Sequence, residues 1–155
     1  MESVWSQLLA NTSIWSGLLA WGTAQAIKMT LAWRKTHEFD FRYFISTGGM
    51  PSAHSAAVCG MATSVGLRAG LGSPVFAVAA TFAIIVMFDA QSVRRAAGQQ
   101  ARLLNQIVAE LFKAHHLSTH KLAELLGHTR LEVFFGLLLG VAIALGIEGL
   151  LARPA

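Results

Sequence analysis

The sequence predicts an all-α integral membrane protein: a helical bundle with about four transmembrane helices and an interfacial amphipathic helix. Hydrophobic residues make up 54% of the chain and charged residues only 13%, whereas a soluble domain usually carries about a quarter charged residues. Apolar segments of 14 to 22 residues recur along the chain, and the longer ones suffice to cross a hydrocarbon core roughly 30 Å thick. Because no internal repeat, low-complexity tract or long linker divides the chain, we expect residues 1–155 to form one membrane-embedded domain.

Four apolar segments are the predicted transmembrane helices. The first covers residues 13–33, and the second begins at Pro51, after a glycine-rich loop, and ends near residue 69. The third covers residues 75–88 and the fourth residues 130–151. Apolar pairs recur every four residues near residues 99–113, which is typical of a one-sided helix lying on a membrane or covering a bundle.

Two stripes of small residues predict close contacts between helices. Small residues at four-residue spacing allow membrane helices to approach closely. The stripes are Ala56, Gly60 and Ser64 in the second helix and Gly136, Gly140 and Ala144 in the fourth.

The loop before the second helix has the composition of an anion site. Gly48 and Gly49 permit backbone angles that other residues avoid, and Pro51 suits the first position of a helix. The N–H groups and positive dipole end of that helix favour a phosphate or carboxylate, with Ser52 as a hydroxyl donor and His54 as a proton donor. The alternative is an ordinary Gly-Pro turn that opens a helix carrying a histidine by chance.

Four alternating crossings bring polar residues from separate parts of the chain to one membrane face. They are Lys28, Ser52, His54, Asp89, Arg94, Arg95 and His128. A site composed of these residues is one interpretation; the other is that polar residues gather at helix ends in any membrane protein. Lys28 itself either snorkels to the interface or turns inward.

The distribution of basic residues predicts an orientation. Ten of the twelve Lys and Arg residues fall on the face with these polar residues, so the positive-inside rule makes that face cytoplasmic and places both termini outside. We expect a location in the bacterial inner membrane. The net charge of +4 favours an anionic lipid surface or substrate over nucleic acid, because the bases are not gathered into a soluble domain.

Metal binding is not expected. Three histidines, at positions 115, 116 and 120, lie near one another in the sequence, but no cysteine or paired carboxylate completes a ligand set. We therefore expect neither a metal nor another cofactor.

Three stretches of the chain resemble the type 2 phosphatidic acid phosphatase superfamily, which includes vanadium-dependent haloperoxidases, and most closely its divergent, short membrane branch. They are Gly48-Gly49-Met50-Pro51-Ser52-Ala53-His54-Ser55, Asp89-Ala90-Gln91-Ser92-Val93-Arg94-Arg95-Ala96-Ala97-Gly98-Gln99-Gln100-Ala101 and Leu126-Gly127-His128-Thr129-Arg130-Leu131-Glu132-Val133. With the helices between them, the resemblance spans nearly the whole chain.

The chain matches the motifs of the broader superfamily in part. Pro51-Ser52-Ala53-His54 matches Pro-Ser-Gly-His with Ala for Gly, and Lys28 and Lys35 keep the spacing of Lys-x6-Arg-Pro with lysine for arginine and Thr36 for proline. His128 and Glu132 keep the His-x3-acid spacing of the third motif, whose arginine position is Leu122 here. Arg94 or Arg95 would replace that arginine.

The resemblance implies roles for individual residues. His128 would attack phosphorus, His54 would protonate the leaving alcohol, and Glu132 would orient His128, although Thr129 and Glu132 also have the spacing of a helix-capping box. Phosphate would be bound by Lys28, Lys35, Arg42, Ser52, Arg94 and Arg95, with Gly48, Gly49 and Asp89 in support.

The implied activity is hydrolysis of a lipid phosphate monoester, of the phosphatidic acid or phosphatidylglycerol phosphate type, through a phosphohistidine. The expected partners are this substrate and the bilayer, and a homo-oligomer is compatible with the sequence. A non-enzymatic membrane protein, or an anion-binding or transport module with the same basic pocket, is the alternative.

Overall fold

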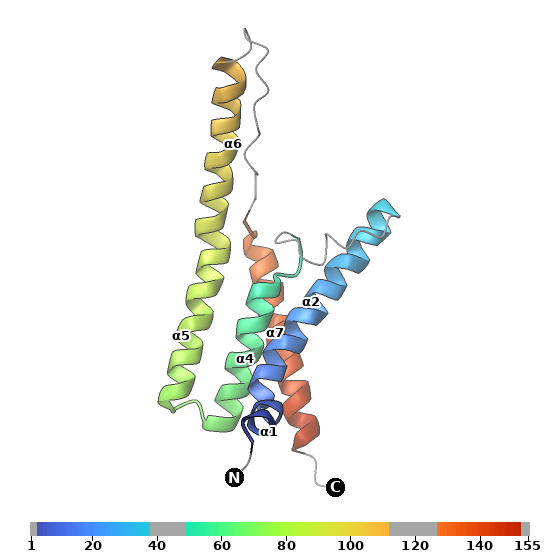
Figure 1. Cartoon of the computed structure of the whole chain (residues 1–155), viewed down its shortest axis with the longest axis vertical. Helices are drawn as coiled ribbons and strands as arrows, with labels where there is room; N and C mark the ends of the chain where they lie inside the picture. Colours follow the sequence, from blue (N-terminus) through green and yellow to red (C-terminus); the bar gives the residue numbers. More distant parts are fainter. Residues whose placement is uncertain (1–2, 38–48, 112–126, 153–155) are drawn as a thin grey trace.

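The computed structural model describes residues 3–37, 49–111 and 127–152, and within these ranges it confirms the all-α prediction (Figure 1). The helices in chain order are α1 (Val4–Leu9), α2 (Thr12–Thr36), α4 (Ala53–Ala69), α5 (Pro74–Phe88), the π-helical segment η1 (Asp89–Val93), α6 (Arg94–Leu111) and α7 (Arg130–Leu151).

Local capping explains where several helices begin and end. The Asn11 side chain accepts from the backbone N–H of Ile14 at the start of α2, and His37 ends that helix in the left-handed region with φ 56°. The bounds of α7 are those expected from the sequence. The short helix α1 was not predicted.

The second transmembrane helix begins later than predicted. Pro51 lies before α4, and Ser52 is the N-cap, whose hydroxyl oxygen accepts from the backbone N–H of Ser55 at 3.3 Å. A serine is a stronger N-cap than the methionine that a start at Pro51 would require, because its side chain satisfies an otherwise unpaired N–H group.

The expected amphipathic helix is α6, but it begins at Arg94 and not near residue 99. It continues the line of α5 through η1, so that the three segments form one long rod (Figure 1). The apolar side chains of Leu103, Leu104 and Ile107 on α6 are exposed. The position of this helix relative to a membrane interface stays a prediction.

Helix α4 lies at the centre of the bundle, in contact with α2, α5 and α7. Both predicted small-residue stripes are buried at these contacts. A Cβ added at Gly140 would collide with the carbonyl oxygen of Ala56 and lie 2.8 Å from the backbone nitrogen of Gly60, and one at Gly136 would collide with the carbonyl oxygen of Ser52. The glycines of α7 therefore allow direct backbone contact with α4, as the stripes predicted.

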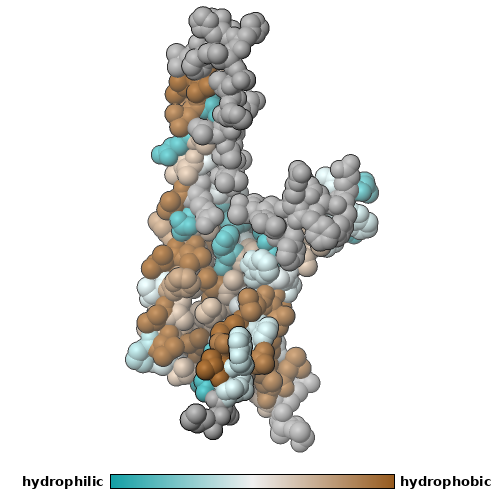
Figure 2. Space-filling view, viewed as in Figure 1, coloured by the Kyte–Doolittle hydropathy of each residue, from teal (hydrophilic) through white to brown (hydrophobic). Residues whose placement is uncertain are grey.

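The apolar surface of the bundle faces outward. Two helical stretches among the described residues are long and apolar enough to cross a membrane, Pro74–Ala109 and Arg130–Leu151. Only 11% and 22% of their most apolar windows are buried, whereas the core helix of a soluble protein is mostly buried. Figure 2 shows hydrophobic residues over much of the visible face of α5 and of the bundle. Crossings by α2 and α4 stay predictions.

A polar network joins three helices at the end of the bundle where the two termini lie (Figure 1). The Glu148 carboxylate of α7 accepts from the hydroxyls of Thr12 (3.0 Å) and Ser64 (2.6 Å), and Arg68 forms an ion pair with it at 3.4 Å. Because these partners belong to α2 and α4, the network fixes the spacing of the helices at that end. The polar residues considered next lie at the opposite end.

Candidate active site

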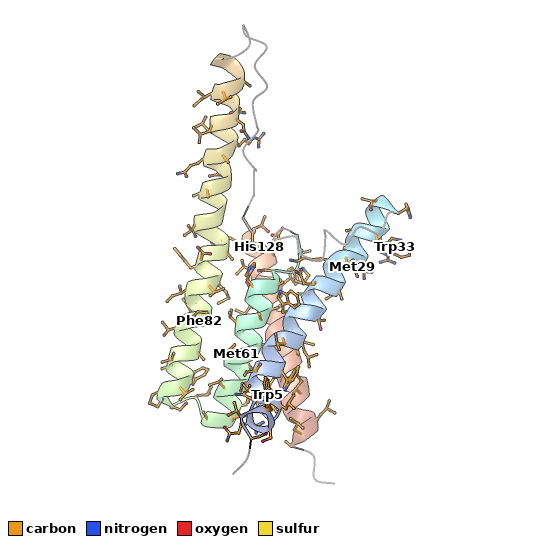
Figure 3. All side chains as sticks on the ribbon, in the orientation of Figure 1. Trp5, Met29, Trp33, Met61, Phe82 and His128 are labelled. Atoms are coloured by element: carbon orange, nitrogen blue, oxygen red, sulfur yellow. The ribbon has the colours of Figure 1, made fainter. Side chains whose placement is uncertain are left out.

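His128 lies immediately before α7 and is buried, with 1% of its surface exposed. Its backbone N–H donates to the carbonyl oxygen of Ala90 in η1 at 3.0 Å. Figure 3 shows it at the end of the bundle where α4 and α7 begin. The backbone of His128 is thus held by a hydrogen bond to the π-helical segment and by its covalent connection to the start of α7.

Glu132 holds the ring of His128. Its Oε2 atom lies 2.8 Å from His128 Nδ1 and also accepts from the backbone N–H of Thr129 at 3.2 Å. The Thr129 hydroxyl accepts in turn from the Glu132 backbone N–H, which completes the capping box. The sequence left open whether Glu132 orients the histidine or caps the helix, and in the structure it does both.

This contact selects the tautomer of a neutral His128. An ionised carboxylate only accepts hydrogen bonds, so the proton of a neutral ring lies on Nδ1 and the lone pair on Nε2. Nε2 is buried and has no hydrogen-bond partner among the described residues. The nitrogen with nucleophilic character is therefore the one that no described residue contacts by a hydrogen bond.

His54 stands opposite His128, in the first turn of α4. The two ring centroids are 6.1 Å apart, and the rings are inclined at 62°. Residues 74 positions apart in the sequence are thereby brought into ring contact, whereas the predicted topology placed them only at the same end of the bundle.

Ser52 ties the start of α4 to α7. Its backbone N–H donates to the carbonyl oxygen of Glu132 at 2.9 Å, so this N–H is not available to an anion. Its buried hydroxyl oxygen accepts from the hydroxyl of Ser55 at 3.0 Å. Sequence reasoning did not single out Ser55, although a serine three residues after an N-cap serine was a usable signal.

Lys28 of α2 turns inward. It is only 6% exposed, and the cost of burying its ammonium group is only partly offset by electrostatic attraction to the Glu132 carboxylate. Gly49, with φ 90°, lies beside it: a Cβ on this glycine would be 4.0 Å from Lys28 Cδ. The snorkelling alternative for Lys28 is therefore wrong, and three segments of the chain supply charges and imidazoles to one place.

For most of the remaining predicted site residues, the structure describes only the backbone or does not describe the residue. Asp89 is half-buried and opens η1, next to the residue that bonds His128. The backbones of Arg94 and Arg95 begin α6, and that of Lys35 lies near the end of α2, but the described part of the structure does not include their side chains. Gly48 and Arg42 lie outside the described residues.

No metal-binding group was found in the parts of the chain that the structure covers, where no three His, Cys, Asp or Glu side chains gather suitably. The fold and the site together define a helical membrane protein in which a buried histidine, held by a carboxylate, packs against a half-buried histidine and a buried lysine interacts electrostatically with that carboxylate.

Comparison with known proteins assigns the family. The family model described as the divergent PAP2 family matches residues 9–143, and the chain belongs to this family. The chain is also 43% identical over 150 residues to the uncharacterized membrane protein YuiD of Bacillus subtilis (strain 168), across 90% of this chain and 95% of that protein. No solved structure matches the chain.

Proposed function

We propose that the protein is a membrane phosphatase that hydrolyses a lipid phosphate monoester through a phosphohistidine on His128. The observation that carries the proposal is the contact of 2.8 Å between His128 Nδ1 and Glu132, which leaves the lone pair of a neutral ring on the buried Nε2 atom. The centroid of this ring lies 6.1 Å from that of a second imidazole, His54.

In the first step, Nε2 of His128 forms a bond to phosphorus while the bond from phosphorus to the lipid oxygen breaks. His54, as imidazolium, gives its proton to the departing oxygen, so that a neutral alcohol leaves. The Glu132 carboxylate stabilises the positive charge that develops on the ring of His128.

In the second step, water attacks the phosphohistidine. The now neutral His54 takes a proton from this water as its oxygen bonds to phosphorus, and the bond from phosphorus to Nε2 breaks. Inorganic phosphate leaves, and both histidines return to their starting states.

Positive charge near the phosphate lowers the barrier of both steps. We assign this charge first to Lys28, which lies next to Gly49 and interacts electrostatically with Glu132 in a buried setting where electrostatic interactions are strong. Arg94 and Arg95 lie in the chain directly after η1, which contacts His128, and we assign them to the phosphate oxygens in place of the arginine missing at Leu122. Lys35 and Arg42 complete the proposed basic set.

The predicted orientation favours an inner-leaflet substrate. If the histidine end is cytoplasmic, as the charge distribution predicts, the substrate is a lipid of that leaflet, of the phosphatidic acid or phosphatidylglycerol phosphate type. Both termini, which lie at the opposite end of the bundle, would then be outside.

Hydrolysis of phosphatidic acid and phosphatidylglycerol phosphate by the purified protein, compared with its variants, tests the proposal. We expect His128→Ala and His54→Ala to lose activity by orders of magnitude while their thermal unfolding stays close to that of the wild type. His37→Asn is the matched control, because it removes an exposed imidazole and places another residue that tolerates the left-handed region.

The result also separates the enzyme from its rivals. A protein that only binds or transports the anion would release no phosphate, and a packing role for the histidines would appear as lost stability. Full activity of His128→Ala would refute the proposal.

A further inference from the structure

An apolar groove opens beside the site, between α2 and α7. It has a volume of about 410 Å³, within the range of ligand pockets. All of its lining residues are apolar: Ile27, Leu31, Met50, Pro51, Phe135, Leu138 and Leu139. We propose that this groove holds an acyl chain of the lipid whose phosphate lies between Lys28 and the histidines, an inference that rests on the proposed function.

The groove is continuous with the site through two segments of the chain. Met50 and Pro51 line it and directly precede Ser52, the cap of the helix that carries His54. On α2, Ile27 and Leu31 line it on either side of Lys28 in the sequence. A ligand in the groove would thus have its charged end beside the buried ammonium and its apolar part against apolar side chains. A lipid with an anionic headgroup and an acyl chain has this combination of groups.

The groove also runs in the direction that an acyl chain requires. His128 lies just before the first residue of α7, Arg130, whereas Phe135 and Leu139 are five and nine residues further on. At about 1.5 Å per residue these positions lie roughly 8 and 14 Å along the helix from its start. Because α7 is apolar enough to cross a membrane, this path leads from the helix end toward the bilayer interior.

Two other features of the molecule explain why the groove is open at this place. In Figure 1, α2 is inclined to α4 and α7, and its C-terminal half diverges from them. Leu139, which lines the groove, also packs against the buried cluster formed by Ala20, Ala24, Ala53 and Ala56. Through Leu139 the groove is therefore joined to the bundle core.

The groove would act by positioning the substrate. An acyl chain gains little hydrophobic free energy on leaving other lipid chains, which are as apolar as leucine. Contacts in a shaped groove instead fix the depth and direction of the chain, and with them the distance from the phosphate to His128 Nε2. We therefore expect the groove to prefer the substrate lipid over other bilayer lipids, because the headgroup and the acyl chain of the substrate bind at the same time.

Photolabelling tests the inference without any need for turnover. The probes are phosphatidic acid and phosphatidylcholine, each with a diazirine in one acyl chain, in vesicles of phosphatidylcholine that contain the wild-type protein. We expect the phosphatidic acid probe to label Phe135 and Leu139 roughly tenfold more than the phosphatidylcholine probe does, a discrimination of the size that pocket contacts provide. Equal labelling by the two probes would show only the annular lipid that coats any membrane helix, and would overturn the proposal.

A variant that fills the groove supplies the control. Leu138→Trp should abolish the preference for phosphatidic acid, and Leu145→Trp should retain it, because Leu145 is a similarly exposed leucine of α7 that does not line the groove. Ile27→Trp fills the groove from α2 and gives the same reading if Leu138→Trp does not fold. Retained preference in a folded groove-filling variant would refute the inference.

The two proposals fail in different ways. Selective labelling without any hydrolysis would support the groove as a lipid site and refute the proposed phosphatase activity. Hydrolysis without selective labelling would support the phosphatase activity and refute the lipid site in the groove.

Discussion

Replacement of Glu132 by glutamine tests whether the carboxylate is needed for catalysis or only for the helix start. In the structure one oxygen of Glu132 accepts from both His128 Nδ1 and the Thr129 N–H, at 2.8 and 3.2 Å. Glutamine has the same length and retains an acceptor oxygen, but it has no charge to stabilise the imidazolium of His128 or to attract Lys28.

The expected loss follows from the difference between two kinds of hydrogen bond. A bond to a charged group contributes about 1.5–3 kcal/mol and a neutral bond about 1 kcal/mol, so Glu132→Gln should cost about 0.5–2 kcal/mol of transition-state stabilisation. This corresponds to a decrease of roughly 2- to 30-fold in kcat/KM. Phosphate release from phosphatidic acid in mixed micelles measures it, with thermal unfolding recorded on the same samples.

Thr129→Ala is the matched control for the cap. It removes the hydroxyl that accepts from the Glu132 N–H at 3.3 Å but leaves the contact between His128 and Glu132. We expect a loss of about 0.5–2 kcal/mol in the free energy of unfolding and little change in kcat/KM below the unfolding temperature. If Glu132→Gln loses no more activity than Thr129→Ala, Glu132 is only a cap and the reasoning is refuted.

Three further predictions concern chemistry, packing and topology. Vanadate should inhibit hydrolysis as a five-coordinate mimic of phosphorus under attack, and chelators should leave the rate unchanged because Lys28 and the arginines supply the positive charge; activity that chelators abolish and magnesium restores would contradict this. Gly140→Ala should lower the stability by about 1–3 kcal/mol, since its Cβ meets the backbone of α4, whereas Gly146→Ala, with nothing within 4 Å, should not; equal unfolding temperatures in detergent would show that the contact between α4 and α7 is loose. In a Cys59→Ala background, an impermeant thiol reagent on intact cells should label Gly72→Cys and not Thr36→Cys, and the reverse pattern would place the histidines outside.

The elements that the sequence predicted best are those with strong local signals. The bounds of α7 follow from a capping box at its start and an unbroken apolar run, and the contact between α4 and α7 follows from glycines at four-residue spacing. Counting alternating crossings placed His54 and His128 on one membrane face, but it did not predict that their rings lie in contact, which the structure shows.

Other features have no signature in the sequence. The carbonyl oxygen of Ala90 fixes the backbone of His128, but any residue type presents a carbonyl, so only the π-helical path of η1 shows it. The inward turn of Lys28 could not be read from the sequence, because Glu132, the carboxylate that partly offsets the cost of burying its charge, lies 104 positions away. The later start of α4 arose because the capping hydroxyl of Ser52 outweighed the preference of Pro51 for a first helical position.

Trapping of a phosphoenzyme tests the central claim most directly. The His54→Ala variant, which lacks the group that assists departure and the later attack of water, is incubated with phosphatidic acid labelled with ³²P in its phosphate and quenched in alkali, in which phosphohistidine survives. We predict label on the protein, at the peptide that contains His128 and on its Nε2 atom, and none when His128 is also replaced by alanine. Label at any other residue, or hydrolysis that continues in His128→Ala, would contradict the account.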